Sequence, residues 1–124
     1  MLNRRVLLGA LGAIAAAPAQ NQENRAVTLH RQPLPAPLQG WEAEFVSVTV
    51  PPGPGSAPHH HRGFVLGYVI DGAFRFAIEG QPEQVLRAGE VFYEPPAANH
   101  TVSASADPAR NAHILAIVIA EKEQ

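Results

Sequence analysis

Proline and glycine divide this chain into segments that are too short for helices of ordinary length. Twelve prolines and ten glycines interrupt its 124 residues. Between them, apolar residues recur at every second position, as Val46, Val48 and Val50 do around Ser47 and Thr49. An alternation of this kind is typical of a half-buried strand. The chain beyond residue 19 is therefore predicted to be all-β, folded as an antiparallel sandwich or barrel.

Turn residues separate several short strands in the second half of the chain. Asp71 and Gly72 lie between the apolar alternations 64–70 and 74–78, a pattern that indicates a hairpin. Further strands are expected over 84–87, 91–94, 101–105 and 112–120. The last of these is almost entirely apolar, which favours a strand that is buried on both faces.

Residues 1–19 have the pattern of a cleaved export signal. Arg4 and Arg5 form a short positive region, an apolar run follows over 6–17, and small residues stand at a cleavage position over 17–19. An apolar run of about a dozen residues is shorter than the roughly 20 needed to span a bilayer, so no stable membrane anchor is expected. The adjacent arginines resemble the twin-arginine motif, which predicts a bacterial protein that folds before export and is periplasmic or secreted.

Residues 20–40 are predicted to form a flexible, proline-rich leader, and residues 41–121 the folded domain. Pro33, Pro35 and Pro37 exclude a helix or a central strand from the segment 32–39. Folding is expected to begin near Trp41, a few residues before the first regular alternation of apolar residues.

The charge and the cysteine content exclude several classes of function. Nine basic residues stand against eleven acidic ones, for a formal charge of −2, and no basic stretch follows the first few residues. Nucleic acid is therefore not an expected partner. The chain has no cysteine, which excludes a disulfide framework, a thiolate metal site and a cysteine nucleophile. Any metal must bind to histidine, aspartate or glutamate.

Histidines supply the candidate metal ligands. On an extended strand His59 and His61 project to the same face about 6.6 Å apart, and both imidazoles then reach one ion, while His60 points the other way. His100 joins them only if a neighbouring strand brings it over. From spacing alone, a solvated histidine run and an unrelated surface histidine explain the pattern equally well.

Two groups of residues resemble the two sequence motifs of the cupin superfamily. Their members here are Gly55, His59, His61 and Gly72 for the first motif, and Gly89, Pro95 and His100 for the second. Ala97 stands where the second motif usually has a further glycine. The resemblance covers about residues 41–121. It implies a small single-domain cupin, a β-barrel or double-stranded jelly roll that holds one divalent transition metal, which is Fe, Mn, Zn, Ni or Cu.

This chain departs from the usual first motif at one metal-binding position. The resemblance places a glutamate at position 65 or 66, where this sequence has Val65 and Leu66. Either the three histidines hold the metal alone, or another acid completes the site. Glu94 is the candidate for that acid, as a ligand or as the catalytic group that moves protons. The competing interpretation of Glu94 is a solvated carboxylate at a strand end.

Two classes of function are open to such a site. One is an enzyme, either a small mononuclear-metal oxygenase acting on a small organic substrate, or a non-oxidative isomerase or lyase. The other is a non-catalytic module that captures a small ligand. In both classes the expected partner is a small molecule, the metal is the only cofactor, and a homodimer is the one macromolecular assembly considered.

The export hypothesis predicts the outcome of one conservative double substitution. We expect Arg4→Lys with Arg5→Lys to keep the chain in the cytoplasm with residues 1–19 attached, because the twin-arginine pathway reads the arginine pair itself. A general secretion signal tolerates this change, since the apolar run 6–17 is untouched. Cell fractionation with mass determination of the processed chain measures the outcome. Normal periplasmic processing of the double variant would contradict the twin-arginine interpretation.

Overall fold

A computed structural model describes residues 24–55 and 57–123. The regular secondary structure in these two ranges consists of β-strands alone. In chain order the eight strands described there are β1 (Arg25–Pro33), β2 (Trp41–Val50), β3 (Phe64–Asp71), β4 (Ala73–Ile78), β5 (Gln84–Arg87), β6 (Val91–Glu94), β7 (His100–Ser105) and β8 (Ala112–Glu121). All of their pairings are antiparallel. The all-β, antiparallel prediction is confirmed.

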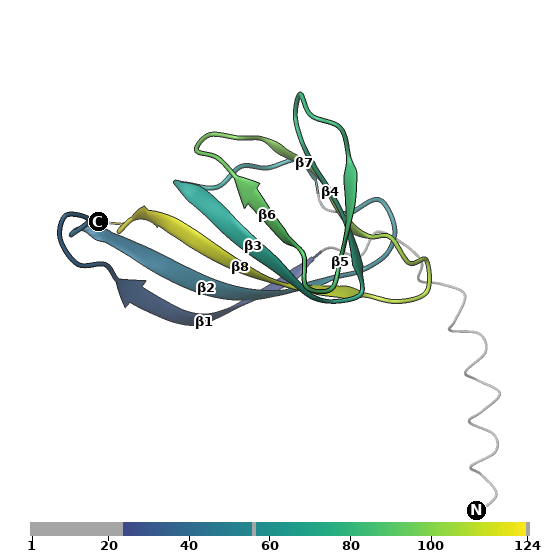
Figure 1. Cartoon of the computed structure of the whole chain (residues 1–124), viewed down its shortest axis with the longest axis horizontal. Coiled ribbons are helices and arrows are strands. Elements are labelled where there is room, and N and C mark those ends of the chain that lie inside the picture. The colour runs from purple at the N-terminus through teal and green to yellow at the C-terminus, as the bar shows by residue number, and fades with distance from the viewer. Residues whose placement is uncertain (1–23, 56, 124) are drawn as a thin grey trace, which may run out of the picture.

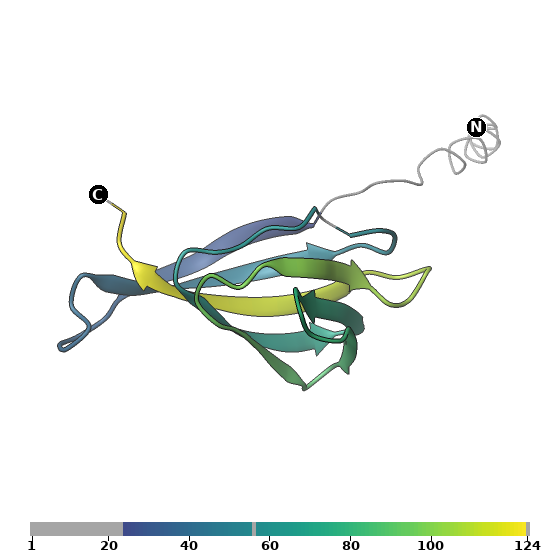
Figure 2. The ribbon, with the colours of Figure 1, turned by 90° about the horizontal axis from the view of Figure 1, so that it is seen from above.

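The strands form two sheets. One has five strands in the order β1-β2-β8-β3-β6, and the other has three in the order β5-β4-β7. Figure 1 shows the smaller sheet over one end of the larger one, with the Trp41 end of β2 extending beyond it. Seen from above, the larger sheet runs side by side from β1 through β2 and β8 to β3 (Figure 2). No helix among the described residues is long and apolar enough to cross a membrane.

The hydrophobic core lies between the two sheets. Phe74 on β4 is fully buried and packs against Phe92 on β6, with ring centroids 5.4 Å apart. Phe76 packs on the same ring at 4.7 Å. Each fully buried side chain of this size stabilises the fold by about 1.5–3 kcal/mol. Further core members come from β2, β3, β5 and β8, namely Val50, Val65, Val69, Leu86, Ala112 and Ile114.

The hairpin expected at Asp71 and Gly72 is wrong, although both flanking strands exist. β3 pairs with β8 and β6, whereas β4 pairs with β5 and β7. Gly72 alone links the two strands, which is one residue fewer than the shortest common hairpin loop. It has a φ of +84°, and a Cβ there would lie 3.0 Å from the Cα of Ala112. This close corner carries the chain from one sheet to the other.

The segment expected to be a flexible leader contributes an edge strand instead. β1 pairs antiparallel with β2 from Arg25 to Pro33. An edge strand tolerates Pro33 because one of its sides needs no ladder hydrogen bonds. Arg31 forms ion pairs with Glu42 and Glu44 on β2, at 3.0 and 3.2 Å. The prolines exclude a central strand but not an edge strand, so the sheet begins at Arg25.

The expectation that the last strand is buried on both faces is also wrong. β8 is central in the larger sheet, yet only its inward face meets the smaller sheet, and its outward residues Leu115 and Ile117 stay partly exposed. Neighbouring outward residues are more exposed still, including Leu66 at 45% and Val91 at 68%. The apolar run of β8 therefore includes residues of an outer face that is apolar but is not covered by a second layer. In a sandwich of two sheets the core forms between the inner faces, which leaves the outer face of the larger sheet open.

A close approach between strands makes Gly67 a test of this packing. A Cβ at Gly67 on β3 would lie 2.0 Å from the ring of Phe92, which is itself buried in the core. We therefore expect Gly67→Ala to destabilise the domain by about 1–3 kcal/mol, because the ring must move into occupied space. Urea unfolding measures the difference, with Val91→Thr on the exposed face as the control. Equal free energies of unfolding for Gly67→Ala and the parent chain would contradict this account.

Candidate metal centre

Two segments that lie far apart in the sequence meet at the candidate site. His59 and His61 belong to the loop before β3, and His100 is the first residue of β7. Backbone hydrogen bonds join them in both directions, from His59 N to His100 O at 3.1 Å and from His100 N to His59 O at 2.6 Å. The loop is thereby held beside β7 as an isolated bridge. This pairing brings His100 to the histidine pair.

The three imidazoles converge. One ring nitrogen from each of His59, His61 and His100 lies within 4.8 Å of the others. The ring centroid of His59 is 5.1 Å from that of His61 and 5.0 Å from that of His100, and neither pair is stacked flat. Two nitrogens that bind one tetrahedral ion at about 2.1 Å are about 3.4 Å apart, so a small inward movement of the rings would let all three bind one ion. His60, between them in the chain, does not belong to the group.

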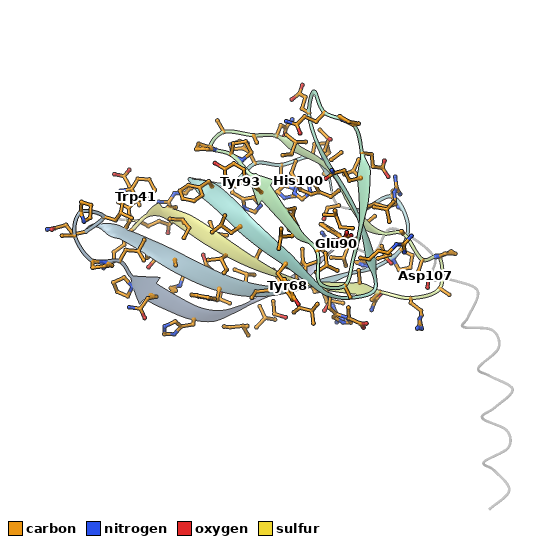
Figure 3. All side chains as sticks on the ribbon, in the orientation of Figure 1. Trp41, Tyr68, Glu90, Tyr93, His100 and Asp107 are labelled. Carbon is orange, nitrogen blue, oxygen red and sulfur yellow. The ribbon has the colours of Figure 1, made fainter. Side chains whose placement is uncertain are left out.

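The surroundings of His100 favour a bound ion. Its ring packs against Phe76, with centroids 4.9 Å apart, and only 4% of the residue is exposed. Figure 3 shows it in the space enclosed by the two sheets. Both of its ring nitrogens are buried and lack a hydrogen-bond partner among the described residues. Leaving a buried polar atom unpaired costs about 1–3 kcal/mol, and a metal ion would remove that cost for the ring nitrogen that binds it. The residues present therefore fit a metal.

Glu94 lies beside two members of this group, His100 and His61. Its Oε2 atom is 3.0 Å from His100 Nδ1, and its Oε1 atom is 3.8 Å from His61 Nε2. The residue is only 3% exposed, so the interpretation of Glu94 as a solvated carboxylate is wrong. Strand alternation explains its direction, because Glu94 shares the inward face of β6 with Phe92.

The protonation of His61 suits metal binding. Burial lowers the pKa of this imidazole below its ordinary value, against the opposing field of Glu94, and the neighbouring histidines lower it further. A lowered pKa keeps the ring neutral down to more acidic pH. Neutral imidazole is the form that binds a metal, so the lowered pKa reduces competition from protons.

A cavity of about 520 Å³ adjoins the histidines. This volume falls in the range of pockets that bind small molecules, roughly 300–1,000 Å³. Its apolar wall comes from the inward faces of β2 and β8, with Val46, Val48, Ile114, Ala116 and Val118. Charged side chains line its other end. A small organic molecule therefore has room beside a bound ion.

One row of paired residues runs across the larger sheet and connects both ends of the cavity. From β6 to β1 it consists of Glu94, Val65, Val118, Glu44 and Arg31, each paired in register with the next. All five line the cavity. With strands about 4.8 Å apart, the row places some 14 Å of sheet between the two glutamates. The middle of the row is apolar and both ends are charged.

Sequence reasoning misses the charged end of this cavity. Glu42 and Glu44 occupy even positions of β2, as Val46 and Val48 do. The alternation that places the two valines on the inward face therefore also predicts that the two glutamates face inward. Arg31 carried no comparable signal, because its segment resembles a leader.

The chain belongs to the cupin domain family. That family, Cupin_2, matches residues 46–118, which is more than half of the chain. The match includes the three histidines and Glu94. Curated proteins give no match to this sequence.

Solved structures with the same fold include several cupins. KdgF from Halomonas sp. has a TM-score of 0.63 and 22% identity, over 84% of this chain and 86% of its own. Iron(II) HppE in complex with substrate has a TM-score of 0.56 and 18% identity, over 61% of this chain and 45% of its own. The DMSP lyase DddQ from Ruegeria pomeroyi DSS-3 has a TM-score of 0.58 and 22% identity, over 66% and 40%. These similarities show a shared fold.

The geometry predicts opposite effects for two adjacent histidines. We expect His61→Ala to abolish most of the divalent metal bound by the folded chain, about one ion per chain, because a ligand is lost. His60→Ala should leave the metal content unchanged, since His60 stands outside the group. Elemental analysis after reconstitution and gel filtration measures both, with circular dichroism to confirm folding. Equal losses in the two variants would contradict the assignment.

Proposed function

We propose that this chain is an exported cupin that uses one divalent transition metal to act on a small organic molecule, as a mononuclear-metal oxygenase. The observation that carries the proposal is a group of three histidines at the wall of a small-molecule cavity, in which the buried His100 has two ring nitrogens without a hydrogen-bond partner among the described residues. His59, His61 and His100 are the proposed ligands. When bound there, Fe, Mn, Zn, Ni or Cu supplies Lewis acidity, and the redox-active ions also supply electron transfer.

The residues of the chain supply binding and orientation. His61 stays neutral and available as a ligand because burial lowers its pKa. Val46, Val48 and Val118 present an apolar surface that excludes water and packs the body of a substrate. Glu94 places a negative charge against two of the imidazoles. Together these features orient a small molecule with one end at the metal.

The structural neighbours support two versions of this chemistry. Iron(II) HppE shows that the fold accommodates an iron site with a substrate, which supports the oxygenase. DddQ is a lyase on the same fold, which supports the non-oxidative alternative, an isomerase or lyase. A cavity that binds a ligand without converting it is the third version, in which either the metal or the metal-free pocket captures the ligand between the same walls.

Export and assembly are further parts of the proposal. The twin-arginine signal falls on residues 1–19, outside the residues that the structure describes, and the periplasmic or secreted location stays a prediction. The homodimer also stays a prediction, which sedimentation equilibrium of the folded chain decides.

Oxygen consumption separates the versions of the proposed function. We expect the iron(II)-loaded chain to consume oxygen in step with the loss of a small enolic or diketone substrate, and the zinc-loaded chain to consume none, since zinc has no redox chemistry. His100→Ala should abolish the consumption through loss of the metal. An oxygen electrode and product analysis by mass spectrometry provide the measurement. Conversion without oxygen consumption would establish the lyase or isomerase, and binding without conversion would establish the binding module.

A further inference from the structure

We infer that Glu94 is the fourth metal ligand of this site, supplied by β6 from the position directly across from Val65 on β3. The inference rests on the proposed metal site and decides between the roles open to Glu94, ligand or proton carrier. It also explains how this chain binds a metal although Val65 and Leu66 stand where the resemblance places a glutamate.

The contact between Glu94 and His100 is one that two ligands of a single ion make. The atoms Oε2 and Nδ1 are 3.0 Å apart, yet His100 Nδ1 has no hydrogen-bond partner, so the pair is close without being hydrogen-bonded. Two atoms that each lie about 2.1 Å from one ion are about 3.0 Å apart at a right angle and about 3.4 Å apart at the tetrahedral angle. The second separation, 3.8 Å from Oε1 to His61 Nε2, corresponds to a wider angle at the ion.

The register of the sheet identifies the position that Glu94 replaces. Glu94 and Val65 are direct cross-strand partners, and both line the cavity. Side chains of such partners start only about 4.5–5.5 Å apart. Val65 is 1% exposed and faces inward, whereas Leu66 is 45% exposed and faces outward. Position 65 is therefore the one that faces the histidines, and Glu94 brings its carboxylate to the same space from the next strand.

The burial of Glu94 favours a cation beside its carboxylate. Its side chain is 4% exposed, and among the described residues its only partners within salt-bridge distance are the two imidazoles, with no lysine or arginine. Oε1 is buried and has no hydrogen-bond partner there. A buried carboxylate without a counter-charge costs several kcal/mol. A divalent ion shared with the histidines supplies that charge, and the site then carries one positive charge in place of two.

Moving the carboxylate between the two strands tests the inference. The variants are Glu94→Gln, Glu94→Val and the exchange Val65→Glu with Glu94→Val, and the exposed Glu83→Gln is the matched control. The probe is Co²⁺, titrated into the metal-free chain and followed by its visible absorption bands. We expect Glu94→Gln and Glu94→Val to weaken Co²⁺ binding by more than about 100-fold, beyond the 10–100-fold typical of losing a hydrogen-bond partner of a ligand. The bands should change shape, and the exchange should restore most of the affinity.

Thermal unfolding provides a readout that does not depend on activity. We expect the metal-free Glu94→Val chain to unfold at the same or a higher temperature than the metal-free parent, because an uncompensated buried charge is removed. In the presence of Co²⁺ the parent should unfold at the higher temperature, since the ion binds the folded parent more tightly than the folded variant and stabilises it more. This reversal also shows that the variant folds.

The outcomes distinguish this inference from the proposed function. If the parent chain binds Co²⁺ and loses it in His61→Ala, while Glu94→Gln keeps the parent affinity and spectrum, the inference is overturned and the metal site stands. If the folded parent binds no Co²⁺, Zn²⁺ or Fe²⁺, both are overturned. If the exchange variant folds but binds Co²⁺ as weakly as Glu94→Val does, the claim that a carboxylate reaches the metal equally well from position 65 and from position 94 is overturned.

Discussion

The paired backbone hydrogen bonds between His59 and His100 are the contact on which the site depends. They fix the loop that carries His59 and His61 beside the first residue of β7. The bonds lie between peptide groups, so they position the histidines independently of side-chain chemistry. Side-chain packing then sets the orientation of His100 through the ring of Phe76. The site is therefore built from a backbone constraint first and from core packing second.

The same core packing also sets the direction of Glu94, so the geometry of the site depends on the packing of the fold. Phe92 fills the space left by Gly67, and its strand ends two residues later at Glu94. Because successive residues alternate between faces, the orientation that buries Phe92 also turns Glu94 inward. A shift of one residue in the register of β6 would expose the ring and remove the carboxylate from the histidines. The stability of the core and the geometry of the site therefore both depend on the register of β6.

Local patterns in the sequence were sufficient for most strands of this fold, but not for the edge strand β1 or for all of the strand pairings. The alternation around Val46, Val48 and Val50 gave the strand and its inward face, because burial on one face has a period of two. Asp71 and Gly72 suggested the wrong pairing, because a glycine corner between two sheets and a hairpin turn use the same residues. The edge strand from Arg25 was missed since its side chains are exposed on both faces and show no period of burial.

The candidate site was predictable where it rests on residue type and spacing. His59, His61 and His100 could be grouped from the two motifs, whereas the distance between them could not, because it depends on a bridge between distant segments. The inward direction of Glu94 followed from the alternation that buries Phe92, whereas its place opposite Val65 followed only from the pairing of β6 with β3. The charged end of the cavity needed Arg31, which comes from a strand that sequence patterns alone do not reveal.

The bridge between His59 and His100 also has a mechanical consequence for a chain that has no cysteine. A metal ion held by both residues would act as a cross-link between the loop before β3 and the start of β7. Because such an ion dissociates when the chain unfolds, its stabilisation comes from binding to the folded state, and it amounts to about 2.7 kcal/mol at a free-ion concentration 100 times the dissociation constant. The ion would then stabilise a domain that contains no disulfide, and removing it would loosen the segment between His59 and His100, which carries β3, β4, β5 and β6.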